Sequence, residues 1–302
     1  MIRQRHRAVR GKPAVLYLNE LSYFAMSSNT IYDYSSLRCE WLWVYDAPVP
    51  TSDLWSKDVL VPPGVFFVLK GRGMIEADGQ TLDLPAGTAF FSAPGLRRQW
   101  FEKGTRLLSV GFRATWPDGL PLFNAGLNSL HPASRLRKLH TATRSLFRGI
   151  HGDLRTVTFH DASSADRTGF GLWCQHEAAF RVWFAAYVET LTKLGILPTQ
   201  RPRPRDERLL EIIRRLDAWP LARALLRHEI VAGLHLGGRR MEQLLAAELG
   251  VTPHAYLDRR RLESARHLVM RADVPLKQVA HELGFRHASH FTKWFRRHTG
   301  AA

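Results

Sequence analysis

Cysteine is scarce in this chain, since only Cys39 and Cys174 occur among its 302 residues. Two cysteines cannot build a disulfide framework or the ligand set of a zinc finger, so we expect free thiols in a reducing compartment. Long apolar runs are also missing, because none reaches the ~18 residues that span a bilayer. The basic N-terminus lacks the apolar stretch of a signal peptide. The sequence therefore predicts a soluble, cytoplasmic protein with no membrane partner.

Histidine is missing where a metal centre would need it. Residues 88–101 contain none, and no His-x-His pair occurs in the strand-rich part of the chain. A protein-bound catalytic metal needs three or four converging donor atoms. The chain also lacks a glycine-rich phosphate loop, a nucleophile elbow and a Cys/His arrangement. We therefore predict no catalytic residues, no metal site and no cofactor.

Positive charge is what the chain has in excess. Its formal net charge is +16 and its isoelectric point is about 10.6. Such a balance favours an anionic partner, with nucleic acid first. The charge is spread over both halves of the chain, so charge alone does not locate the binding face. The length suggests roughly two domains, each large enough to bury a core.

Short β-rich runs dominate residues 36–115, after a polar and irregular arm over residues 1–35. Asp78-Gly79, between two of these runs, is typical of a two-residue hairpin turn. Many short strands at close spacing predict a β-sandwich or a barrel. The runs are WLWVY (41–45), VFFVLKG (65–71), MIEA (74–77), TLDL (81–84), TAFFSA (88–93) and RLLSVGF (106–112).

Helical patterns follow in residues 116–197. A basic helix is predicted over about 132–149 and a strongly apolar helix over 175–194. Apolar residues recur on the second helix at three- and four-residue spacing: Phe180, Trp183, Phe184, Tyr187, Leu191 and Leu194. This face either packs on the β-region or forms a homodimer seam, and the sequence does not separate the two. The alternating prolines and arginines of residues 198–205 then predict an extended linker.

The most informative stretch is PLKQVAHELGFRHASHFTKWFRRH, residues 275–298. Two short helices meet at Gly284, where a helix-turn-helix needs a left-handed backbone, and Ala280 leaves room for close helix approach. A related unit is predicted over residues 226–249, and a helix over 256–270 joins the two. At ~15 residues, the joining helix spans about 22 Å and could hold two probe helices for successive major grooves. Residues 206–302 are therefore expected to form an all-helical DNA-binding domain.

Residues 206–300 resemble the DNA-binding module of the AraC/XylS family of bacterial transcription regulators. The strings GVTPHAYLDRRRLESARHLVMRADVPLKQVAHELGF and SHFTKWFRRHTG carry the resemblance. It implies that helices 238–248 and 288–298 face the DNA. By position, the base-facing residues are Arg239, Glu242, Gln243, Ser289, His290 and Lys293. Gln243 suits adenine and Arg239 suits guanine. Phosphate contacts are expected from Arg240, Lys293, Arg296 and Arg297. Phe291, Trp294 and Phe295 share one helical face and are expected to be core.

Three features depart from the family pattern. His235 stands where a small residue is usual, and Gly237-Gly238 stands where a Ser or Thr N-cap is usual, which raises the entropic cost of ordering that helix. His287 replaces the usual capping residue of the second probe helix. The chain also ends at Ala302, short of the family's usual end, so we expect either that the last helix frays or that the sequence is a shortened form. We predict intact but weaker DNA binding.

The N-terminal half resembles, more loosely, the cupin-like sensor barrel of the same family, through its strand pattern and the Pro85-Ala86-Gly87 turn. The expected fold is therefore α+β. It combines a cupin-like β-barrel or jelly roll with flanking helices and an all-α domain with two helix-turn-helix units joined by a central helix. The expected contacts to a sugar or an anionic metabolite are Trp41, Trp43, Phe66, Arg97, Arg98 and Trp100. Only alternate strand residues face inward, so about half of these must be wrong, and ordinary core is the competing interpretation.

The predicted function is sequence-specific regulation of transcription, as an activator that responds to a small-molecule effector. Double-stranded DNA, the effector and a second copy of the chain are the expected partners, and RNA polymerase is a further candidate. Two alternatives stay open. One is a cupin-type enzyme fused to a DNA-binding tail. The other is a non-specific DNA-binding protein, for which the net charge would suffice.

Overall fold

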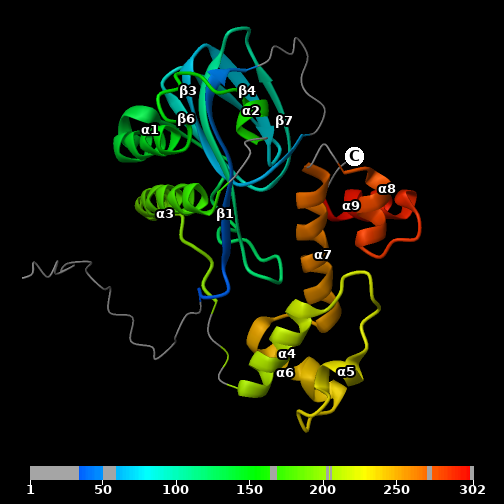
Figure 1. The fold of residues 1–302 in the computed structure, drawn as a ribbon. Helices are drawn as coiled ribbons and strands as arrows, with labels where there is room; N and C mark the ends of the chain where they lie inside the picture. Colours follow the sequence, from blue (N-terminus) through cyan, green and yellow to red (C-terminus); the bar gives the residue numbers. More distant parts are fainter. Residues whose placement is uncertain are drawn as a thin grey trace, which may run out of the picture. The chain divides into compact units, whose positions relative to one another are not determined.

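The computed structural model describes residues 34–49, 59–163, 169–201, 204, 206–270 and 274–299. Almost all of the predicted N-terminal arm, part of the predicted linker and residues 300–302 lie outside the described residues. The strands are β1 (Arg38–Pro48), β2 (Val59–Val61), β3 (Gly64–Lys70), β4 (Arg72–Ala77), β5 (Gln80–Pro85), β6 (Thr88–Ser92), β7 (Gly95–Phe101), β8 (Arg106–Thr115) and β9 (Ser129–Pro132). The helices are η1 (Ala133–Leu136), α1 (Arg137–His151), α2 (Phe159–Ser163), α3 (Phe170–Lys193), α4 (Glu207–Ala218), α5 (Arg227–Val231), α6 (Gly238–Leu249), α7 (Pro253–Met270), α8 (Leu276–Glu282) and α9 (Ala288–Thr299), as Figure 1 shows.

The strands form two antiparallel sheets. The five-stranded sheet has the order β1-β8-β3-β6-β9, and the four-stranded sheet has the order β2-β7-β4-β5. Among the described residues no strand of one sheet pairs with a strand of the other, so the expectation of a closed barrel is wrong, whereas the mixed class of sheets and helices is confirmed. Two of the edge strands are short, with three residues in β2 and four in β9.

The hairpin predicted at Asp78-Gly79 joins β4 to β5. Ala77 pairs with Gln80, and the two turn residues have φ angles of 51° and 72°. Two consecutive left-handed residues are what a type I′ turn requires, and Asp-Gly adopts it at low cost. The structure also contains strands β2, β7 and β9, which were not predicted from the sequence. The two adjacent arginines and a glutamine of β7 hide the apolar alternation by which a strand is recognised.

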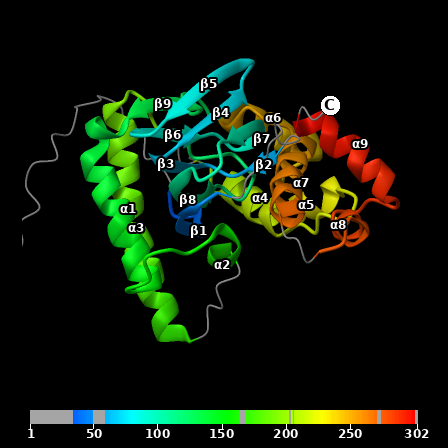
Figure 2. The ribbon, with the colours of Figure 1, turned by 90° about the horizontal axis from the view of Figure 1, so that it is seen from above.

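Helices α1 and α3 cover one face of the five-stranded sheet, where they lie side by side (Figure 2). Phe180, Trp183, Tyr187 and Leu191 of α3 are buried against this face. The Phe112 ring of β8 lies 5.0 Å from the Tyr187 ring and 5.7 Å from the Trp183 ring. Each fully buried side chain of this size contributes about 1.5–3 kcal/mol. The apolar face of this helix therefore packs on the sheet, and these four side chains are not available to a second copy.

A buried carboxylate ties α1 to the sheet. Asp46 of β1 is 1% exposed, and it accepts hydrogen bonds from Arg106 Nε at 2.6 Å and from Arg144 of α1. His151, at the end of α1, places its Nε2 2.8 Å from the carbonyl oxygen of Val44. These contacts join the middle and the C-terminal end of the helix to one strand.

The helices after residue 206 form two hydrophobic clusters that share α7. The first cluster gathers α4, α5, α6 and the start of α7, and its members include Leu209, Ile212, Leu216, Ile230, Met241, Leu245 and Tyr256. The second gathers the end of α7 with α8 and α9, through Ala265, Val279, Ala280, Leu283 and Phe291. Since α7 has 18 residues, it is about 27 Å long at 1.5 Å per residue. One continuous helix thus contributes to both clusters.

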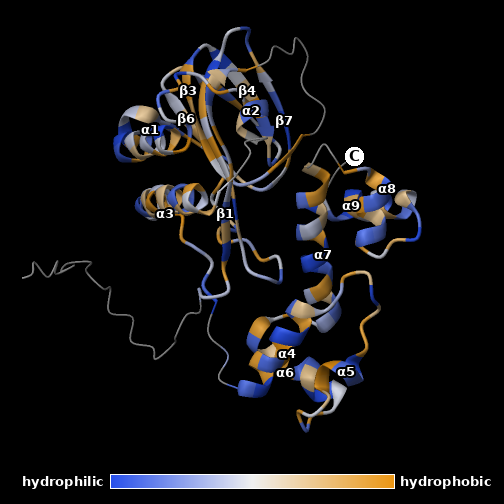
Figure 3. Cartoon of the chain, viewed as in Figure 1, coloured by the Kyte–Doolittle hydropathy of each residue, from blue (hydrophilic) through white to orange (hydrophobic). Residues whose placement is uncertain are grey.

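The distribution of hydropathy follows this packing. Hydrophobic residues run along the strands, and the outer side of α1 is hydrophilic (Figure 3). Within the described ranges, no helix combines the length and the apolar character needed to cross a bilayer.

Candidate nucleic-acid interface

Helices α8 and α9 meet at the turn predicted from Gly284. The residue has a φ of +84°, and a Cβ atom built on it would lie 2.7 Å from the Cα atom of Ala222. Both the left-handed backbone and this close approach require glycine. Ala280 is 1% exposed in the cluster between the helices, which agrees with its predicted role. The turn therefore holds α9 at a defined angle to α8.

The outer face of α9 carries every residue predicted there for DNA: Ser289, His290, Lys293, Arg296 and Arg297. All five side chains are exposed. Phe291, on the opposite face, is 1% exposed, and its ring stacks on Phe295 at 5.5 Å. Trp294 and Phe295 pack against the same cluster, so these aromatic residues are core, as expected. The helix thus presents one polar, basic stripe to its surroundings.

Three cations on this stripe have no acidic partner. Within the described part of the chain, no ion pair involves Lys293, Arg296 or Arg297. Several other arginines after residue 206 do have acidic partners, among them Arg208, Arg214 and Arg223. Uncompensated, exposed cations at three- and four-residue spacing are suited to an anionic backbone.

Helix α6 presents a second set of predicted residues. Arg239, Arg240 and Gln243 are exposed. Arg240 donates a long hydrogen bond of 3.5 Å to Gln243 Oε1. Glu242 is partly buried and pairs with Arg227 of α5 at 2.9 Å. This carboxylate is therefore occupied within the chain, which the sequence did not indicate.

The start of α6 shows the departures from the family pattern. His235 has a left-handed φ of 51°, a conformation that costs roughly 1–2 kcal/mol for a residue with a side chain. Gly237 precedes the helix without a side-chain capping bond. The entry to α6 therefore lacks the hydrogen bond that a Ser or Thr cap would supply.

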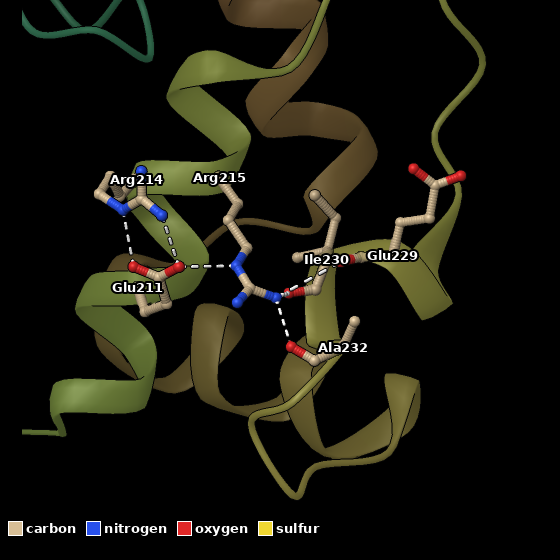
Figure 4. A network of polar contacts seen from close by, with 6 residues as sticks. All are labelled: Glu211, Arg214, Arg215, Glu229, Ile230 and Ala232. Atoms are coloured by element: carbon tan, nitrogen blue, oxygen red, sulfur yellow. Dashed lines mark hydrogen bonds and ion pairs between the residues drawn. The ribbon is translucent and has the colours of Figure 1, made fainter.

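An arginine of α4 supports the end of α5 (Figure 4). Arg215 donates from Nη1 to the carbonyl oxygens of Ile230 at 2.9 Å and Ala232 at 2.7 Å. Its Nε donates to Glu211 at 2.7 Å, and Glu211 also accepts two bonds from Arg214. These bonds to Arg214 and Arg215 lower the pKa of Glu211 to about 2. The Arg215 side chain therefore donates to carbonyl groups at the end of α5 that have no partner within this short helix.

Two arginines of α7 have the same kind of role. Arg260 donates to the carbonyl oxygens of Leu216 at 2.5 Å and Trp219 at 2.9 Å. Arg261 donates to the carbonyl oxygen of Leu283 at 3.1 Å, just before the turn at Gly284. Burial lowers the pKa of Arg260. These residues position the helix pairs, although in the sequence they resemble a run of surface charge.

The residues predicted to bind a ligand divide between several surroundings. Phe66 lies in the cluster between the two sheets, and Arg97 lies against it. Trp43 of β1 donates from Nε1 to Ser109 Oγ at 3.3 Å. Trp41 is 1% exposed in the other cluster, on the side of the helices. Arg98 pairs with Glu76 on the outer face of its strand, and Trp100 shares that face by alternation.

Metal ligands do not gather in the described parts of the chain, where no group of three or more His, Cys, Asp or Glu residues is placed to hold a metal ion. The two cysteines are free. Cys39 is buried, and burial raises the pKa of its thiol to about 12.

Comparisons with known proteins concern both halves of the chain. A family model described as a helix-turn-helix domain matches residues 230–302. The HTH-type transcriptional activator RhaS of Klebsiella pneumoniae strain 342 is 34% identical over 234 residues, which cover 77% of this chain and 80% of that protein. RhaS of Citrobacter koseri is 33% identical over 233 residues, with the same coverage. A crystal structure of apo ToxT from Vibrio cholerae covers 90% of this chain and 97% of its own, at 15% identity and a TM-score of 0.38, too low to add to the sequence relatives.

Proposed function

Because the chain belongs to the AraC/XylS family of bacterial transcription regulators, we propose that α6 and α9 read a specific DNA duplex. The two RhaS proteins are named transcriptional activators, and activation is the direction proposed here. In this proposal the β-sandwich is a cupin-like jelly roll that binds a small effector, for which a sugar is one candidate. Effector binding then alters how the helical part engages DNA.

The observation that carries this proposal is the basic stripe of α9. Lys293, Arg296 and Arg297 are exposed and have no acidic partner among the described residues. We assign Arg296 and Arg297 to phosphates, together with Arg240 of α6. Phosphate contacts of this kind set register on the duplex without reading its sequence.

We assign the contacts to DNA bases to the residues nearer the start of each helix. Arg239 can donate two hydrogen bonds to guanine, and Gln243 can pair with adenine through two bonds. Gln243 first gives up its 3.5 Å contact with Arg240, which is long and therefore weak. Ser289, His290 and Lys293 are the corresponding residues of α9. Glu242 would have to leave Arg227, so we rank it below the others.

We also propose that the regulator is a homodimer. Its second copy would contact the exposed side of α3, where Phe170 is 79% and Val182 is 73% exposed. The Phe170 ring stacks on the Trp173 ring at 5.7 Å. Two linked DNA-binding parts multiply affinity through effective concentration, and an effector shifts activity only if it favours one arrangement. RNA polymerase stays a candidate partner.

The test is selection of bound sequences from a random pool of duplexes, with the full chain and two variants. Wild type should enrich one sequence. Gln243→Ala should lose preference at one base pair, by roughly tenfold to a hundredfold. Arg297→Ala should weaken binding to all sequences and keep the preference. A wild-type chain that enriches nothing, or binds no duplex, would refute the proposal.

A further inference from the structure

Arg97 lies between the two β-sheets without a carboxylate partner. On β7, Gln99 and Phe101 share the inward face with Arg97, and Arg98 lies on the outward face. The Arg97 guanidinium lies 5.7 Å from the centroid of the Phe66 ring and 5.5 Å from that of Phe90. An inward cation over two buried aromatic rings is unusual, because charged side chains rarely lie in such surroundings unless they are paired.

The hydrogen bonds of Arg97 leave part of its guanidinium unused. Nη1 donates to Ser92 Oγ at 2.6 Å, and Nε donates to Gln99 Oε1 at 3.0 Å. Both acceptors are neutral. A guanidinium has five N–H groups, so those on Nη2 have no acceptor in the described part of the chain. Desolvation lowers the pKa of Arg97 to about 10, and the side chain stays charged at neutral pH.

The surroundings of Arg97 are both accessible and amphipathic. Arg97 keeps part of its surface open to solvent. Tyr45 of β1 lies near Arg97 and opposes the lowering of its pKa by desolvation, and the hydroxyl of Ser109 accepts from Trp43 at 3.3 Å. The Phe159 ring of α2 lies 5.0 Å from the Trp43 ring and 5.8 Å from the Tyr45 ring. The Phe66 and Phe90 rings, the Ser92 hydroxyl and Tyr45 therefore lie next to the Arg97 cation, and the Phe159 ring lies against Tyr45.

The chemistry of this site favours one class of ligand. The unused N–H groups of a guanidinium fit the two oxygens of a carboxylate, and that interaction is stronger where water is excluded. One cation balances one negative charge, so a phosphate dianion would leave charge uncompensated. The rings of Trp43, Tyr45 and Phe159 keep part of their surface exposed and suit an apolar or aromatic body. A neutral sugar would leave the charge of Arg97 without a counter-ion.

We propose that Arg97 anchors a small monocarboxylate with an apolar or aromatic body between the two sheets. This inference rests on the proposed function, since it names the chemical class of the effector of the same regulator. It selects the anionic metabolite over the sugar as the expected ligand.

Calorimetric titration of the full chain in a carboxylate-free buffer provides the binding test. The probes are benzoate, phenylacetate and octanoate, each compared with its neutral amide, and glucose and phenyl phosphate represent the other ligand classes. At least one carboxylate should bind and its amide should not. Arg97→Gln should weaken that binding by roughly tenfold to a hundredfold. Arg98→Gln, on the outer face of the same strand, should leave it unchanged. Absence of carboxylate binding at millimolar concentration, equal binding of the amides, or an unaffected Arg97→Gln variant each overturns the proposal.

Thermal unfolding without ligand provides a second test. If the role of Arg97 is to bind a ligand, its charge lacks a carboxylate partner in the free protein and destabilises it. Arg97→Met should therefore raise the unfolding midpoint by roughly 2–4 °C. Arg98→Met, which breaks an exposed ion pair, should change it little. A lower midpoint for Arg97→Met would show that Arg97 stabilises the fold itself and would overturn the proposal.

The same variants separate this inference from the proposed function. Suppose that a carboxylate binds in an Arg97-dependent way but does not change the affinity for a selected duplex. That result would contradict the proposed effector-responsive regulation and would still support a carboxylate as the ligand. Selective duplex binding that responds to glucose and not to carboxylates would support the proposed function and would overturn the assignment of a carboxylate ligand to Arg97.

Discussion

Replacing Gly284 with alanine should destabilise the α8–α9 pair by about 2–5 kcal/mol, as the sum of two effects. The residue has a φ of +84°, and holding alanine in this left-handed conformation costs roughly 1–2 kcal/mol. The added Cβ would lie 2.7 Å from Ala222 Cα and 3.0 Å from its carbonyl oxygen. Both are backbone atoms, so relief requires a shift of the chain, at about 1–3 kcal/mol.

Gly250 provides a matched control for this prediction. It ends α6 with a φ of +65°, and a Cβ there would meet nothing within 4 Å. Gly250→Ala therefore keeps only the conformational cost, about 1–2 kcal/mol. Amide hydrogen exchange within the helices beside each site measures the free energy of local opening. Equal losses in the two variants would refute the claim that the backbone of Ala222 confines Gly284.

Three further changes test contacts within the chain. Arg215→Ala should cost about 1–3 kcal/mol in urea unfolding, because partly exposed carbonyl groups at the end of α5 lose a charged donor. Arg214→Ala, with a side chain that is 70% exposed, should cost far less, and equal costs would contradict the role of Arg215. Asp46→Asn should cost about 2–3 kcal/mol, less than the loss expected for a fully buried pair, because its two arginines are 36% and 35% exposed; an unchanged urea midpoint would refute this. The pKa of Glu211 is lowered from 4.5 to about 2, so its stabilisation is complete above pH 4.5 and is lost as the pH falls toward 2. In Glu211→Gln the unfolding midpoint should depend less on pH over that range than in wild type. Parallel pH profiles for the two proteins would contradict the assignment.

Backbone requirements made parts of the fold predictable from the sequence. Asp78-Gly79 and Gly284 occupy left-handed positions, where few residue types are tolerated, so the residue type itself reports the turn. The aromatic face of α9 is similarly predictable, because Phe291 and Phe295 recur at helical spacing.

Contacts between distant parts of the chain were not predictable in this way. Whether the two sheets close into a barrel depends on pairing between edge strands, which strand spacing does not reveal. The bonds from Arg215 to the end of α5, and the pair between Arg227 and Glu242, join different helices and leave no local pattern. Among the predicted ligand contacts, Trp41, Arg98 and Trp100 face away from the space between the sheets, and the side that each faces depends on the register of its strand.

The most direct measurement of the central claim is the salt dependence of duplex binding for wild type, Arg297→Ala and Arg214→Ala. Each phosphate contact contributes about 0.9 to the slope of log affinity against log salt concentration. Arg297→Ala should lower the steepness by about that amount and keep the sequence preference. The Arg214→Ala variant should show the wild-type slope, because Arg214 is paired with Glu211. An unchanged slope for Arg297→Ala would contradict the assignment of the exposed α9 face to DNA.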